Sequence, residues 1–268
     1  MQLLIDLWSN YMKILIGSVF SATGEPRLLD LQLAFLHQTT KHHFEHVSYL
    51  TEDANSTHYL GHHNSTVVGQ SQVKHTDPSR SHLNGLLGLL KYFQTVDYDL
   101  YLILDSDAFP IKQGWDQTCI NILNDYDVIS CIRTENLDTF LHPSICAFTD
   151  PSLVDFQRLD NINLMGTKTS DNQVVLLKPQ TSSKPWKQWP DNAKAFPLIR
   201  TNRVNLHPII AAIYGDLFYH HGCGSRSQIL RTDPYYNKLD INHECAQDLM
   251  DQMFTNPHEY LAKLLRSQ

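Results

Sequence analysis

Two aspartates lie one residue apart at the end of the most strand-like segment of the chain. The segment YDLYLILDSDAFPI covers residues 98–111, and its apolar part ends at Asp105 and Asp107, with Ser106 between them. On an extended strand, side chains two residues apart point the same way, so both carboxylates can face one point. Two adjacent carboxylates repel each other unless a cation lies between them. The spacing therefore predicts a site for Mn²⁺ or Mg²⁺, hard cations that take oxygen ligands and often contact substrate phosphates.

The same two aspartates also suit an ordinary turn. Asp is frequent in turns, and Pro110 follows closely. The apolar strand before them favours the metal interpretation, because ligands in open α/β sheets gather at the carboxyl ends of the strands.

The elements that must position these aspartates alternate between strands and helices. Apolar patterns predict strands at 13–19, 44–50, 99–105, 126–132 and 142–149, and helices at 26–40, 79–94 and 114–125, while the polar stretch 53–78 predicts a long loop. A strand is expected from 209 to the histidines at 220–221, and two closing helices at 245–254 and 257–268. This alternation predicts an α/β fold with a parallel sheet of the doubly wound kind, followed by C-terminal helices.

Bulk composition narrows the class of protein. A length of 268 residues suits one large α/β domain, and a formal net charge of −7 argues against general nucleic-acid binding and against a polybasic membrane anchor. No apolar run reaches the ~18 residues that span a bilayer, so we expect no transmembrane segment. The five cysteines are scattered without a C-x-x-C pair, and the N-terminus lacks the pattern of a signal peptide. These features predict buried, reduced thiols and a cytoplasmic location.

Three segments resemble a known enzyme family. YDLYLILDSDAF is similar to the D-x-D motif of GT-A fold, family 2-like glycosyltransferases, and HLNGLLGLLKYF resembles the helix that precedes this motif. FYHHGCGSR, at 218–226, resembles a late histidine-plus-glycine segment of such enzymes. The resemblance implies an α/β fold of the Rossmann-like GT-A type, with an open, mixed and mostly parallel sheet flanked by helices and with C-terminal helices. It also implies a nucleotide-diphosphate sugar donor, Mn²⁺ or Mg²⁺ at its diphosphate, and transfer of the sugar to a hydroxyl of a saccharide or glycoconjugate acceptor.

The resemblance also divides the chain and assigns roles. It implies a single domain over 1–268, with a nucleotide-sugar-binding half at 12–135, an acceptor half at 136–231 and C-terminal helices at 232–268. Asp105, Asp107 and His221 are expected to hold the metal, with His220 facing the opposite side of the strand. Donor contacts are expected from residues after the first two strands, before the helix that precedes the motif, within the motif and after the histidines. These residues are Ser18, Phe20, Glu52, Asp53, Arg80, Ser106 and Arg226. Asp171 is the expected catalytic base, and Glu135 and Asp138 are alternatives.

Other functions share parts of this pattern. A nucleotidyltransferase would carry a glycine-rich basic loop after the first strand, whereas SATGEPR has a single glycine. A phosphatase of the haloacid-dehalogenase type would place its D-x-D motif near the N-terminus. A non-catalytic nucleotide-sugar or carbohydrate-binding module would bind the donor without turnover, and metal-dependent release of the nucleoside diphosphate distinguishes the enzyme from it.

Overall fold

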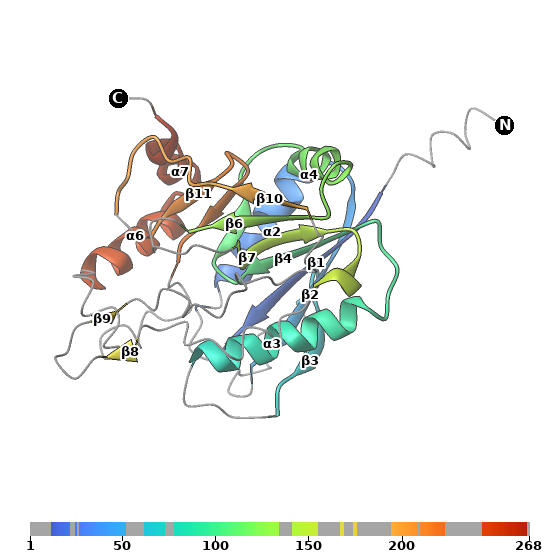
Figure 1. Ribbon diagram of the computed structural model, residues 1–268. Helices are drawn as coiled ribbons and strands as arrows, with labels where there is room; N and C mark the ends of the chain where they lie inside the picture. The colour runs from blue at the N-terminus through green and yellow to red at the C-terminus, as the bar shows by residue number, and fades with distance from the viewer. Residues whose placement is uncertain are drawn as a thin grey trace.

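Strands and helices alternate along the computed structural model of this chain (Figure 1). The structure describes residues 12–21, 25, 27–51, 62–72, 78–133, 141–154, 167–168, 174–175, 194–207, 210–222 and 243–266. Within these ranges, no helix is both long and apolar enough to cross a membrane.

Seven strands form the main sheet, in the order β10-β6-β7-β4-β1-β2-β3. Their bounds are β1 Lys13–Phe20, β2 His43–Leu50, β3 Thr66–Gln70, β4 Leu100–Asp105, β6 Val128–Ile132, β7 Leu141–Phe148 and β10 Ala195–Leu198. Strand β7 runs antiparallel to β4 and β6, and the other neighbouring pairs are parallel. The predicted fold class, an α/β protein with an open, mixed and mostly parallel sheet, is therefore confirmed.

Helices cover both faces of this sheet (Figure 1). Helices α2 (Arg27–Thr39) and α4 (Trp115–Leu123) pack on one face, and α3 (Pro78–Phe93) packs on the other. The β1 side chains alternate accordingly, because Ile14 and Ile16 join the first core whereas Leu15 and Val19 join the second. Burial on both faces explains why the central strands are almost wholly apolar.

Close packing of α3 depends on small residues. A methyl group added at Gly85 would overlap the side chain of Val19 on β1, and one added at Gly88 would overlap the ring of Tyr49 on β2. Glycine at these positions lets the helix backbone approach the sheet. Helix α3, which also carries His82, therefore lies close against β1 and β2.

A second, three-stranded antiparallel sheet lies next to the end of β4. It consists of β11 (Ala212–Tyr214), β12 (Phe218–His220) and β5 (Ala108–Pro110). The expected single strand from 209 to the histidines is instead a hairpin. Its turn has positive φ at Gly215 (62°) and Asp216 (55°), and Leu217 N donates to Tyr214 O. Positive φ at both central residues is the signature of a type I′ turn, which matches strand twist.

The chain ends in helices α6 (His243–Thr255) and α7 (Pro257–Leu265), which confirms the expected closing helices. They share an apolar cluster with Phe35 of α2, Phe109 of β5 and Tyr219 of β12. The remaining short elements are the 3-10 turn η3 (Pro151–Leu153) and the paired strands β8 (Thr167–Lys168) and β9 (Val174–Val175). The division of the chain at 135 and 231 stays a prediction.

Candidate metal centre

The predicted D-x-D motif lies at the carboxyl end of β4, a central strand of the main sheet. We expected the strand to continue through Ser106. It instead ends at Asp105, and residues 106–107 form a turn before β5 begins at Ala108. Strand β5 then pairs with β12, so that Ala108 lies opposite His220. This pairing brings the late histidine segment beside the two aspartates, as the resemblance implied.

His220 contacts both carboxylates. Its Nε2 atom lies 3.4 Å from Asp105 Oδ2 and 3.4 Å from Asp107 Oδ1. These three side chains each offer one ligand atom to a metal ion, and the ligand atoms all lie within 4.8 Å of one another. An octahedral ion with bonds of about 2.1 Å places adjacent ligand atoms about 3 Å apart. The two carboxylates and the imidazole therefore fit Mn²⁺ or Mg²⁺ in both chemistry and spacing.

A fourth polar group, His82, lies at the open side of this cluster. Its Nε2 atom is 3.2 Å from Asp105 Oδ1, and the His82 side chain is 31% exposed. His82 belongs to the first half of α3, the helix that precedes the D-x-D motif. The Asp105 side chain keeps 16% of its surface exposed, but its Oδ1 atom, the one that faces His82, is buried.

The electrostatics of the cluster favour carboxylates that are ionised around a cation. Burial opposes ionisation of Asp105, but His82 and His220 outweigh it and hold the pKa of this carboxyl well below its ordinary value. Burial likewise opposes ionisation of Asp107, and His220 lowers its pKa below the ordinary value. For His220 burial disfavours the charged ring, yet the two carboxylates raise its pKa to about 9. Protonated His220 therefore supplies positive charge between the carboxylates.

The structure brings His220, rather than the expected His221, close to the two carboxylates. His220, expected on the far side of the strand, faces the carboxylates. The Nδ1 atom of His221 instead lies 2.8 Å from the hydroxyl of Tyr219, which donates to the hydroxyl of Tyr260 on α7 at 3.1 Å. The backbone N–H of His221 donates to Asp107 O at 3.0 Å. The geometry thus favours His220, rather than His221, as the third ligand.

The expected donor contacts are only partly within the described residues. Ser18 is fully buried and donates its hydroxyl hydrogen bond to Gln32, and Phe20 is part of the core. Ser106 lies in the turn between the two aspartates and is 6% exposed. Arg80 lies on α3, but its side chain is not among the described ones. All of these donor contacts stay predictions.

Four of the expected residues, and two alternatives to one of them, fall outside the described parts of the chain. They are the donor contacts Glu52, Asp53 and Arg226, the catalytic base Asp171, and its alternatives Glu135 and Asp138. Their roles stay predictions.

Sequence reasoning missed two side chains that contact the motif. His82 lies within the helix segment that carried the family resemblance, and its position before the D-x-D motif was the available signal. Gln32 is a fully buried amide on the apolar face of α2. A lone buried polar residue in such a face calls for a hydrogen-bond partner, and this partner is the D-x-D turn itself.

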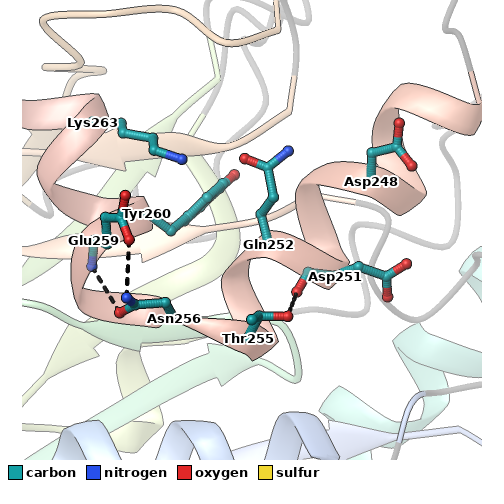
Figure 2. Close-up of a pocket in the computed structure, with 8 residues that line it drawn as sticks. All are labelled: Asp248, Asp251, Gln252, Thr255, Asn256, Glu259, Tyr260 and Lys263. Carbon is teal, nitrogen blue, oxygen red and sulfur yellow. Dashed lines mark hydrogen bonds between the residues drawn. The ribbon is translucent and has the colours of Figure 1, made fainter.

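A separate pocket of about 400 Å³ lies between the two C-terminal helices (Figure 2). Its polar lining comes from α6 and α7, and Figure 2 shows Asn256 bonded to Glu259 at the start of α7. Tyr260 also lines this pocket, and its hydroxyl accepts the hydrogen bond from Tyr219. The pocket contains none of the three candidate metal ligands.

The fold can be compared with that of known proteins. Comparison of the sequence with protein-family models and with curated proteins finds no match. Among solved structures, the chain is similar to a mannosyltransferase, PcManGT from Pyrobaculum calidifontis, solved with GDP-Man and Mn²⁺. The likeness covers 61% of this chain and 50% of that one, with 13% identity and a TM-score of 0.39.

Two further solved structures are similar to this chain. Galactosyltransferase LgtC, solved with donor and acceptor sugar analogues, has 11% identity over 52% of this chain and 58% of its own, with a TM-score of 0.37. TarS 1-349 of S. aureus, solved with UDP, has 16% identity over 45% of this chain and 35% of its own, with a TM-score of 0.33. This chain thus spans about half, or less, of the mannosyltransferase and of TarS.

Proposed function

We propose that this protein is a metal-dependent glycosyltransferase, which moves a sugar from a nucleotide-diphosphate donor to a hydroxyl of a saccharide or glycoconjugate. One observation carries the proposal, the convergence of Asp105, Asp107 and His220 at the carboxyl end of β4. In an open α/β sheet this edge is where ligands bind. Two carboxylates and one imidazole leave room in an octahedral shell for oxygens of a substrate.

Each side chain of the cluster has a role in this proposal. Asp105 and Asp107 would hold Mn²⁺ or Mg²⁺, with His220 as a third ligand once its ring has lost its proton. The cation would supply positive charge opposite the diphosphate of the donor. His82, partly exposed and next to Asp105, can donate a hydrogen bond to a phosphate oxygen. Asp171 is proposed as the base that accepts the proton of the acceptor hydroxyl.

The test measures nucleoside diphosphate release from UDP-, GDP- and dTDP-sugars with an acceptor mixture, in Mn²⁺ and in EDTA. We expect release with at least one donor, loss of release in EDTA, and loss in Asp107→Asn, since an amide keeps the shape but not the charge. Asp30→Asn, at a largely exposed aspartate on α2, is the matched control and should keep full activity.

Thermal shift completes the test, because a ligand that binds only the folded state at ~100 times its Kd stabilises that state by ~2.7 kcal/mol. Metal-dependent stabilisation by a nucleotide without any release would indicate a binding module. If no nucleotide gives a metal-dependent shift and no donor is turned over, the proposal is wrong.

A further inference from the structure

A buried hydrogen-bond network leads from α2 to the backbone of the D-x-D turn. The Nε2 atom of Gln32 donates to Asp105 O at 3.0 Å and to Ala108 O at 2.6 Å. These two carbonyls lie at the two ends of the turn that carries Ser106 and Asp107. One amide group therefore ties together the entry and the exit of the turn.

The orientation of the Gln32 amide follows from its partners. A backbone carbonyl can only accept, so the group that faces Asp105 O and Ala108 O must be the NH₂, and both of its hydrogens are used there. The side-chain oxygen of Gln32 must then accept, and it does so from Ser18 Oγ at 2.8 Å and from His46 Nε2 at 3.0 Å.

Beyond Gln32, every hydrogen bond of the network is donated in the same direction, towards the Gln32 oxygen. Because His46 Nε2 donates to Gln32, the other nitrogen of a neutral ring, Nδ1, must accept, and Ser65 Oγ lies 2.8 Å from it. Ser48 Oγ lies 2.8 Å from Ser65 Oγ and completes the chain. Burial holds the pKa of His46 down to about 3, so the ring is neutral at physiological pH. Every member is at most 9% exposed, and each proton has a defined place.

We propose that Gln32 is a positioning residue for the metal centre, because it fixes the backbone of the turn that holds the carboxylates of Asp105 and Asp107, and that His46 fixes the orientation of the Gln32 amide. This inference rests on the proposed function of the same site. Groups behind the direct ligands of a metal commonly orient them, and their loss costs about 10–100-fold in metal affinity.

The turn needs such support because its two carboxylates repel each other. Burial and the charge of Asp105 both oppose ionisation of Asp107, and the pKa of Asp107 lies below its ordinary value because His220 outweighs them. On the other side of the turn, the backbone N–H of His221 donates to Asp107 O at 3.0 Å. Stacking of Phe35 on Phe109, with ring centroids 4.5 Å apart, also fastens α2 to β5. Helix α2 thus holds both backbone and side chains of this segment.

The experiment is a titration of the full-length, metal-free protein with Mn²⁺, in which electron paramagnetic resonance measures the free ion. It yields the number of sites and the Kd separately, so that a misfolded fraction lowers the number of sites whereas a displaced ligand raises the Kd. The variants are Gln32→Met, which keeps the length of the side chain but loses both donors, and the pair His46→Leu and His46→Gln. Thr39→Val is the matched control, since it removes one buried hydrogen bond from the same helix.

We expect wild type and Thr39→Val to bind about one Mn²⁺ with the same Kd, and Gln32→Met to raise the Kd about 10–100-fold with the number of sites unchanged. His46→Leu should also raise the Kd, and His46→Gln, which restores a donor towards Gln32, should recover most of the loss. If Mn²⁺ binds to wild type but all variants keep its Kd, the positioning role is wrong and the proposed function stands. If Gln32→Met fails to fold, the two His46 variants decide: a raised Kd in His46→Leu that His46→Gln largely restores supports the positioning role, and an unchanged Kd in both contradicts it. If wild type binds no Mn²⁺, both proposals fail.

Discussion

Binding of Mn²⁺ to the candidate centre should release a proton from His220. The carboxylates of Asp105 and Asp107 raise the pKa of this imidazole to about 9, against the effect of burial, so the ring is charged at neutral pH. A metal ion needs the neutral ring as a ligand. The two carboxylates contribute no proton, because their pKa values lie below the ordinary value and both are already ionised.

The size of the effect follows from the distance between pH and pKa. At pH 7 the deprotonation of a group with a pKa of about 9 opposes metal binding by roughly 2–3 kcal/mol. The apparent Kd for Mn²⁺ should therefore fall by nearly tenfold for each pH unit from 7 to about 8.5, and level off above about 9. Among the described residues, His82 on α3, His142 on β7, Tyr219 on β12 and His221 after β12 also interact electrostatically with this cluster.

Isothermal titration calorimetry at pH 7 in two buffers of different ionisation enthalpy measures the released protons directly. We expect nearly one proton per Mn²⁺ for wild type. His220→Gln should bind Mn²⁺ more weakly, with no proton release and little dependence on pH. An apparent Kd for wild type that stays constant from pH 7 to 8.5, without proton release, would refute the assignment of a charged His220 as the third ligand.

Three further predictions concern stability. In EDTA, the melting temperature should fall as pH rises through about 9. The raised pKa of His220 means that its protonated ring stabilises the fold fully below about pH 6.5, and this stabilisation is lost above about pH 9. Thermal melts at pH 6.5, 8 and 9.5 measure this change. Gly215→Ala should cost about 1–2 kcal/mol in chemical denaturation, since φ is 62° there, whereas Asp216→Asn, also at positive φ, should cost less. Gly85→Ala should lower the free energy of unfolding by about 1–3 kcal/mol, because the new methyl group overlaps Val19.

The sequence by itself determined the fold class and the place of the carboxylates. Apolar periodicity is local, so strands and helices such as β1, α2 and α3 could be predicted within a few residues. Their alternation favoured a mostly parallel sheet, and the end of β4 then had to lie at the edge where ligands bind. Asp105 and Asp107 were found because their signal, two charges that end an apolar strand, lies within one short segment.

Only the tertiary structure decided which groups meet these carboxylates. Side chains of neighbouring strand residues point to opposite faces, so the choice between His220 and His221 depends on the register of β12 against β5, which no local pattern fixes. Strand β5 lies about 110 residues before β12 in the sequence, so this pairing is a contact between distant segments. Gln32 reaches the D-x-D turn across 73 positions of sequence, through the packing of α2 on the sheet. Local patterns place residues on elements, whereas contacts between elements are set by packing and pairing over the whole chain.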